Sequence, residues 1–211
     1  MFVQFACLVG KRLTPSVGYK WLYNEARILH RDISLNNLMY YRDRDNDKIY
    51  GVLNDFDLSH QMTGEHPHPR PASTKQRTGT LPFMAIDFLH DTPMIHGYRH
   101  DMESFMWVIL FHIGQYRDGK SVGLSGPYHK WLLDDRRALL IHKVEIRDMV
   151  HDAQAQAAFR PLLRWINKMI AMFDKAGRAI RDHKREPEGK FDMESSGGCI
   201  TFDGFKAILT M

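Results

Sequence analysis

HRDISLNNL, residues 30–38, places His, Arg, Asp and two Asn directly after an apolar segment, where a hydrophobic run could have continued. Polar side chains in apolar surroundings must find hydrogen-bond partners or a ligand, because burying them without partners costs free energy. This stretch is therefore a candidate site, and the residues that the fold brings beside it decide its chemistry.

A β-hairpin is predicted directly after this stretch. Two short runs typical of strands, LMYY (38–41) and KIYGVLN (48–54), flank RDRDND (42–47), a polar turn. If Tyr41 pairs with Lys48, antiparallel counting sets Asn37 opposite Val52, two residues before Asn54 and three before Asp55. We therefore expect Asn37 and Asp55 to be neighbours.

Asp32 completes the predicted site. It lies on the same side as Asn37 if residues 32–37 form a compact loop, so that two carboxylates and one carboxamide converge. Oxygen ligands of this kind suit Mg²⁺, which substrate phosphates and water complete to an octahedron. A third group, free of the metal, can accept a proton, and this combination is the one that phosphoryl transfer needs.

The other metal sites that the sequence suggests are weaker. Asp43, Asp45 and Asp47 resemble part of a calcium loop, but Lys48 stands where that loop needs Gly, so we expect a solvated hairpin turn. Zinc is improbable because His60, His66 and His68 lie in a Pro-containing stretch without complementary Cys or acidic ligands at fixed spacing, which favours a mobile loop.

The flanking segments are predicted to be mainly helical. Thr14 and Pro15 indicate a helix start, and Leu22, Ala26 and Leu29 recur at helical spacing, so we expect a helix that leads into His30. Residues 104–113 are typical of a buried helix. Residues 183–198, HKREPEGKFDMESSGG, are typical of a linker or frayed tail.

Composition sets the limits of any function. The chain has 211 residues, of which 44% are hydrophobic, and a net charge of +4, which is too weak to indicate nucleic-acid binding. Two cysteines make neither a disulfide framework nor a metal-ligand pattern. No apolar run is long enough to span a membrane and the start lacks a signal peptide, so we expect an intracellular protein, cytoplasmic or nuclear.

Four motifs in order resemble those of protein kinases. HRDISLNN is similar to the catalytic loop H-R-D-x-x-x-x-N, and DFDLS, which begins at Asp55, is similar to the metal-binding D-F-G. GTLPFMAID (79–87) is similar to the G-T-x-x-Y/F-M-A-P-E that closes an activation segment. HDMESFMWVILF (100–111) resembles the central C-lobe helix, in which an Asp, here Asp101, holds the catalytic loop from below.

The residues within these motifs look most like those of the fungal-type protein kinase domain family, and the resemblance extends over residues 16–115. It implies a mainly α fold (α+β): a protein-kinase-like C-lobe, helical, with a small antiparallel β-hairpin at the catalytic loop. Residues 1–182 would form this C-terminal lobe, and residues 183–211 a polar linker and short C-terminal tail.

The resemblance also implies roles for individual residues. Asp32 would orient the acceptor hydroxyl and accept its proton, and Asn37 and Asp55 would bind Mg²⁺ that bridges the phosphates of ATP. Arg31 would pair with a phosphate on the activation segment, where Ser73, Thr74 and Thr78 offer hydroxyls. Thr80 matches the Thr that lines the peptide-binding loop and contacts the catalytic Asp.

The sequence departs from the kinase pattern at several positions. Ser34 stands where serine/threonine kinases usually place a Lys that neutralises the transferring phosphate. Asp57 replaces the Gly of D-F-G, which could adopt positive φ more easily. Ile86 and Asp87 replace the Pro and Glu of A-P-E, and Asp87 is one methylene short for the family's structural ion pair.

The N-lobe is expected to be absent from this chain. A kinase N-lobe needs at least ~60 residues for about five strands and a helix. Only 29 residues precede His30, and they contain neither G-x-G-x-x-G nor a strand lysine of the V-A-I-K type. The face that an N-lobe normally covers would then be exposed, and it would be a candidate surface for binding a partner protein.

Two functions of different class remain open. In the first, the chain is part of an ATP-dependent protein kinase of serine/threonine type that acts on a protein substrate, with doubtful activity alone. In the second, it is a catalytically inactive, pseudokinase-like module that binds a regulatory protein. The sequence favours no nucleic acid and no membrane as a partner. An unrelated helical domain with coincidental motifs is the third and weakest alternative.

Overall fold

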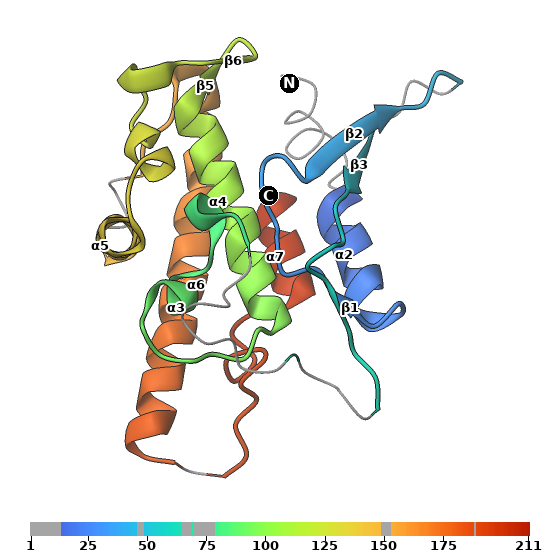
Figure 1. Ribbon diagram of the computed structural model, residues 1–211, viewed down its shortest axis with the longest axis vertical. Helices are drawn as coiled ribbons and strands as arrows, with labels where there is room; N and C mark the ends of the chain where they lie inside the picture. The colour runs from blue at the N-terminus through green and yellow to red at the C-terminus, as the bar shows by residue number, and fades with distance from the viewer. Residues whose placement is uncertain (1–13, 46–48, 65–68, 70–78, 149–152, 188) are drawn as a thin grey trace.

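The computed structural model describes residues 14–45, 49–64, 69, 79–148, 153–187 and 189–211, and these form a helix-rich fold with small antiparallel strand pairs (Figure 1). The predicted mainly α fold class is confirmed. The helices are α2 (Thr14–Asn24), α3 (Ile86–Leu89), α4 (Tyr98–Gln115), α5 (Arg136–Asp148), α6 (Leu163–Arg185) and α7 (Phe202–Leu209).

Short strands and 3₁₀ turns connect these helices. The strands pair as β1 (Ile28–Leu29) with β4 (His60–Gln61), β2 (Leu38–Arg42) with β3 (Ile49–Leu53), and β5 (Tyr116–Arg117) with β6 (Lys120–Ser121). The 3₁₀ turns are η1 (Leu81–Phe83), η2 (Gly123–Ser125), η3 (His129–Leu132) and η4 (Ala157–Leu162).

Helix α4 is the centre of the fold, and every one of its 18 residues is buried. Its stretch from Phe105 to Phe111 is apolar on all sides, the pattern of a helix that is surrounded by other elements. The predicted buried helix over residues 104–113 is therefore confirmed. Helix α6 packs against α4 with a stripe of apolar side chains, Trp165, Ile166, Met169, Ile170 and Phe173.

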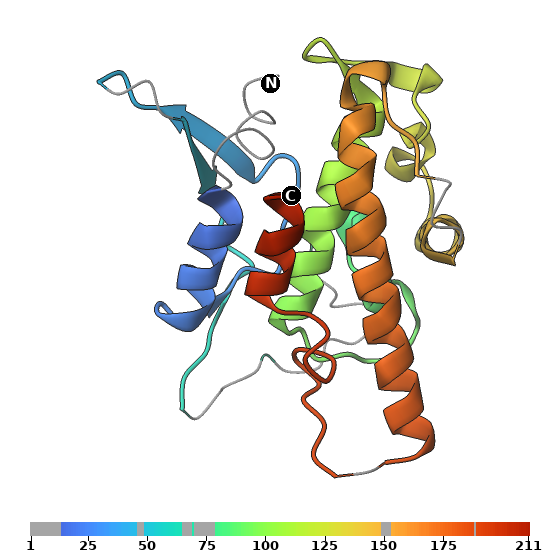
Figure 2. The ribbon, with the colours of Figure 1, turned by 180° about the vertical axis from the view of Figure 1, so that it is seen from behind.

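The end of the chain packs into the same core. Helix α7 contacts both α2 and α6 and lies between them when the molecule is seen from behind (Figure 2). Phe205 and Leu209 are buried there, and the Thr201 side chain caps the helix by accepting a hydrogen bond from the Gly204 amide at 3.0 Å. Residues 199–211 thus contribute to the core, while the predicted division of the chain at residue 182 stays a prediction.

The segment before the catalytic-loop motif differs from the predicted helix. Helix α2 begins at Thr14 as expected but ends at Asn24, and the chain turns through Arg27, whose φ is 57°. Ile28 and Leu29 then pair with β4. The prediction of a helix leading into His30 is therefore wrong, because a tertiary strand pairing replaced the helical turn that the spacing of Leu22, Ala26 and Leu29 suggested.

The predicted β-hairpin is present, but its register was wrong by two residues. Tyr41 pairs with Tyr50 instead of Lys48, and Leu38 pairs with Leu53. Strand β2 continues to Arg42 and β3 begins at Ile49, so the connection keeps its expected length and lies one residue later in the sequence. This change moves Asn37 opposite Asn54, the residue directly before Asp55.

The turn and the histidine-containing stretch are described only in part. The amide of Asp45 donates to Asp43 Oδ1 at 3.0 Å, as in a local polar turn, while Asp47 and Lys48 lie outside the described residues. The predicted mobile loop is wrong at His60, which lies in strand β4. His66 and His68 fall outside the described residues. Among the helices that the structure describes, none has the length and apolar character needed to cross a membrane.

Candidate active site

The loop after β1 is held from below by Asp101 on α4. Asp101 Oδ2 accepts hydrogen bonds from the amides of His30 and Arg31, both at 3.1 Å, although these residues are about 70 positions away in sequence. Arg31 has φ 72°, a left-handed conformation that is unfavourable for a residue with a side chain. The two bonds to one carboxylate oxygen stabilise that conformation, so the predicted role of Asp101 under the loop is confirmed in its geometry.

Asp101 is itself fixed by two further side chains. The Tyr19 hydroxyl donates to Oδ2 at 2.6 Å, and His96 Nε2 lies 2.7 Å from Oδ1. Burial alone would raise the pKa of Asp101, yet His96, Tyr19 and the Arg31 amide together hold that pKa below its ordinary value. Asp101 is therefore a buried carboxylate, and the hydrogen-bond partners of its two oxygens stabilise its charge.

Asp32 stands at the centre of the site with its carboxylate oriented by three donors. The Thr80 amide and hydroxyl donate to Oδ1 at 2.7 and 2.8 Å. Asn37 Nδ2 donates to Oδ2 at 3.1 Å and to the Asp32 carbonyl at 3.0 Å. The predicted compact loop and the predicted contact between Thr80 and Asp32 are both confirmed.

The backbone of the hairpin joins Asn37 to the residue that precedes Asp55. The Asn54 amide donates to the Asn37 carbonyl at 2.9 Å, so Asp55 follows the residue that is bonded to Asn37. Asp55 is exposed, has φ 63°, and accepts the Asp57 amide at Oδ1 at 3.4 Å. The left-handed conformation falls on Asp55 and not on Asp57, which explains why Asp57 can replace the Gly of D-F-G.

His30 joins the loop of Asp32 to the segment that begins at Asp55. The Asp32 amide points at His30 Nδ1 at 3.3 Å, which places the ring proton on Nε2, and Nε2 then donates to the Asn54 carbonyl at 3.0 Å. Phe56 packs edge-on against the His30 ring at 4.9 Å between centroids. The buried imidazole thus links both halves of the site.

The residues at the site fit a hard divalent cation. Asn37 turns its Nδ2 toward Asp32, which leaves the carboxamide oxygen as the atom that can bind a cation, and the carboxylate of Asp55 is exposed. In the described ranges, no three His, Cys, Asp or Glu side chains gather as metal ligands. One carboxylate and one carboxamide are a partial set of the kind that phosphates and water complete around Mg²⁺.

Arg31 and Ser34 lie beside this centre with different surroundings. Arg31 Nη1 donates to the Leu58 carbonyl at 3.3 Å, and burial lowers the pKa of its guanidinium. Ser34 is buried at 1% exposure, and its carbonyl accepts the Asn37 amide at 3.2 Å. The hydroxyls of Ser73, Thr74 and Thr78, which are the candidates to carry a phosphate that pairs with Arg31, lie outside the described residues.

The segment that carries Thr80 is constrained at its start by Gly79. Gly79 has φ 122°, and a Cβ there would lie 3.2 Å from the Arg31 carbonyl and 3.7 Å from Asp32 Oδ1. Both the backbone conformation and the space therefore require glycine. This close approach brings Thr80 to Asp32.

Asp87, which replaces the Glu of A-P-E, does form an ion pair. Its Oδ2 lies 2.7 Å from Arg99 Nη2 and 3.3 Å from His100 Nε2. Burial would raise the pKa of Asp87, but His100 and Arg99 hold it far below its ordinary value. Because Arg99 lies on α4, close to Asp87, the shorter side chain is sufficient.

Three polar residues that support this site were not found from the sequence: His96, Glu103 and Lys143. Glu103 and Lys143 are buried and bond to the segment after Thr80, while His96 bonds to Asp101. Glu103 carried a usable signal, because a carboxylate within the apolar stretch of α4 must find partners when buried. His96 and Lys143 carried none, since exposed loops and helices contain such residues commonly.

Comparison with known proteins agrees with this geometry. Residues 17–113 match the model of the family described as fungal protein kinase. No curated protein matches the chain. The matched range contains the loop of Asp32, the hairpin, Thr80 and most of α4. Over residues 17–113, the chain is therefore similar to the fungal protein kinase family.

Proposed function

We propose that this chain provides the C-lobe half of a protein kinase active site of serine/threonine type, which transfers the γ-phosphate of ATP to a hydroxyl of a protein substrate. The observation that carries the proposal is the Asp32 carboxylate, fixed by Thr80 and Asn37 beside the hairpin that presents Asp55. The match of residues 17–113 to the fungal protein kinase model supports the same chemistry.

The proposed step needs one proton acceptor and oriented phosphates. The acceptor oxygen forms a bond to the γ-phosphorus, the bond to the β–γ bridging oxygen breaks, and the hydroxyl proton passes to Asp32. Mg²⁺, held by Asn37 and Asp55, would neutralise charge on the phosphates. Thr80 fixes Asp32 Oδ1, and Asn37 Nδ2 fixes Oδ2, so that the carboxylate meets the substrate in one orientation.

The exposed face of the hairpin supports a nucleotide above this site. Met39 and Val52 are cross-strand neighbours, and both are exposed, at 48% and 40%. Exposed apolar neighbours beside phosphate-binding groups suit the flat face of an adenine ring. The 211 residues contain no G-x-G-x-x-G, so the half that covers the nucleotide would come from another segment or partner. We expect negligible phosphotransfer from these residues alone.

Binding of Mn²⁺·ATP to the chain tests this proposal. Mn²⁺ should broaden the NMR signals of residues around Asn37 and Asp55 at millimolar nucleotide, and Asp55→Ala should abolish the broadening. Asp57→Ala is the matched control, because Asp57 is also exposed and only two positions away. Equal titration of the two variants would refute the metal site, and ATP turnover by the wild-type chain that Asp32→Asn abolishes would refute the expected inactivity.

A catalytically inactive partner-binding module is the second candidate. It is favoured by four exposed apolar side chains on and beside the hairpin, Met39, Tyr41, Val52 and Phe56. Such a patch marks a protein interaction surface when it is contiguous. This function would replace the first if wild-type protein showed no Mn²⁺·ATP broadening while Met39→Asp and Val52→Asp abolished binding to a regulatory protein.

A further inference from the structure

The segment that follows Thr80 is bonded on two sides by buried charged residues. Lys143 Nζ on α5 donates to the Met84 carbonyl at 2.6 Å, and Glu103 Oε1 on α4 accepts the Ile86 amide at 2.9 Å. Lys143 is 0% and Glu103 7% exposed. Two helices far apart in sequence thus hold backbone atoms only two residues apart.

Trp107 joins the two charges into one cluster. Its Nε1 donates to Glu103 Oε1 at 2.9 Å, and Lys143 Nζ lies 4.8 Å from the centroid of its ring. Trp131 supplies the second aromatic wall, with its centroid 5.4 Å from the same nitrogen. An ammonium between two indole faces gains cation–π stabilisation that compensates part of its lost hydration.

Retaining these charges costs free energy, which argues that they do more than fill space. Burial lowers the pKa of Lys143 and raises the pKa of Glu103, so each charge is disfavoured by its surroundings. Apolar side chains of the same size are often neutral or stabilising at such positions. What an apolar pair cannot do is hold the Met84 carbonyl and the Ile86 amide.

Residue 86 has a backbone N–H to donate because it departs from the kinase motif. The position is Pro in A-P-E, and proline has no N–H to donate. Ile86 restores the donor, and Glu103 supplies the acceptor inside an otherwise apolar helix. The two features therefore fit each other.

A short rigid path leads from this cluster to Asp32. The Met84 amide donates to the Leu81 carbonyl at 3.3 Å and the Phe83 amide to the Thr80 carbonyl at 2.9 Å, which closes the 3₁₀ turn η1. Thr80 then donates twice to Asp32 Oδ1. A shift of Met84 would move Thr80 along with the turn.

We propose that Lys143 and Glu103 act together as positioning residues, a buried clamp that sets the place of residues 79–86 and thereby orients the Asp32 carboxylate. Its consequence for catalysis rests on the proposed function. Its effect on the position of Thr80 does not, and that effect can be measured without nucleotide or substrate.

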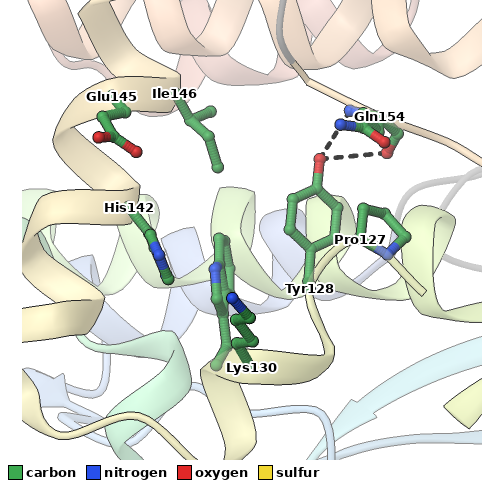
Figure 3. Close-up of a pocket in the computed structure, with 8 residues that line it drawn as sticks. Pro127, Tyr128, Lys130, His142, Glu145, Ile146 and Gln154 are labelled. Carbon is green, nitrogen blue, oxygen red and sulfur yellow. Dashed lines mark hydrogen bonds between the residues drawn. The ribbon is translucent and has the colours of Figure 1, made fainter. Parts of the chain in front are cut away.

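Trp131, which packs against Lys143, borders a surface hollow of about 310 Å³ between η3 and α5 (Figure 3). Trp131 lines it together with Tyr128, whose hydroxyl accepts the Gln154 amide at 2.7 Å on the far side from His142 and Ile146. Tyr128→Phe removes this hydroxyl without touching Lys143 or Glu103. It is therefore the matched control for a change near the clamp.

Four variants test the clamp: Lys143→Met, Glu103→Gln, the double variant and Tyr128→Phe. Lys143→Met alone leaves Glu103 without its counter-charge and should lower Tm. The double variant keeps an oxygen acceptor for the Ile86 and Trp107 donors and buries no charge, so we expect it to recover most of that loss. Comparing the Tm of Lys143→Met with that of the double variant separates an effect on global stability from an effect on the position of Thr80.

Amide hydrogen exchange of Thr80, followed by NMR, is the decisive measurement. In the double variant, we expect exchange at Thr80 to be at least about tenfold faster and its amide resonance to shift, while α4 amides keep wild-type protection. Glu103→Gln, which keeps both acceptor contacts, should leave Thr80 protected. Tyr128→Phe should also leave it unchanged.

Wild-type exchange and chemical shift at Thr80 in a folded double variant would overturn the proposal. If the double variant does not fold, Lys143→Met decides the question by the same Thr80 signals at a temperature where its α4 amides remain protected. Should Thr80 respond as expected while Mn²⁺·ATP does not bind, the clamp would stand and the proposed function would fail.

Discussion

Two carboxylates organise this site, and each accepts hydrogen bonds from donors both near and far in the sequence. Asp101 collects Tyr19, His96 and the His30 and Arg31 amides, while Asp32 collects Thr80 and Asn37. A carboxylate that accepts several hydrogen bonds tolerates burial, because its donors replace water. The loop of residues 30–37 therefore depends more on these few contacts than on its own backbone.

Replacing Asp101 with Asn should destabilise the protein. The carboxamide has only one acceptor oxygen and no charge, so we expect the free energy of unfolding to fall by about 2–4 kcal/mol in urea denaturation followed by circular dichroism. Asp203→Asn is the control, because Asp203 is exposed and its ion pair with Lys20 lies at the surface. Similar unfolding curves for the two variants would contradict the role of Asp101.

The elements of this fold are held by tertiary packing more than by their own propensities. Helix α7 has only eight residues, too few to be stable by itself in water, yet it packs against α2 and α6. Its Phe205 is buried at 1% exposure, and Phe202 stacks on Tyr98 at 4.8 Å. The end of the chain is therefore part of the support for α2 and α4.

Truncating Phe205 to Ala should test this support. Loss of a fully buried aromatic ring leaves a cavity and should lower the free energy of unfolding by about 3–5 kcal/mol. Lys206→Ala, an exposed change on the same helix, should leave the urea midpoint nearly unchanged. If Phe205→Ala behaved like Lys206→Ala, the packing of α7 against the core would be wrong.

Across the whole molecule, burial of histidines makes the fold sensitive to acid. Burial lowers the pKa of both His100 and His112 from 6.5 to about 4. Between these values the unfolded chain binds more protons than the folded one, so stability is complete above pH 6.5 and is lost as pH falls toward 4. Asp87 and Asp101, whose pKa values are lowered, lose their contribution only at still lower pH.

Thermal denaturation at several pH values checks this dependence. Each histidine should contribute up to about 3 kcal/mol of the loss between pH 6.5 and 4. His112→Gln removes one titrating group and should flatten the curve of Tm against pH in that interval. A wild-type Tm that stayed constant from pH 6.5 to 4 would contradict the buried, neutral state of these rings.

The parts of the site that are close in sequence were predictable. The five-residue spacing from Asp32 to Asn37 indicates a compact loop, and the strand-forming runs on either side of a polar turn indicate a hairpin. The apolar stretch of α4 indicates a buried helix. Thr80 and Asp101, which lie far from Asp32 in sequence, were placed beside the loop only through resemblance to the kinase motifs.

By itself, the sequence determined the loop, the hairpin and the buried helix, because spacing and hydrophobic pattern act over a few residues. Only the tertiary structure decided the hairpin register, the end of α2, the place of α7 and the cluster of Lys143 and Glu103. These features depend on contacts between residues tens of positions apart. Such contacts compete with local preference and leave no local pattern in the chain.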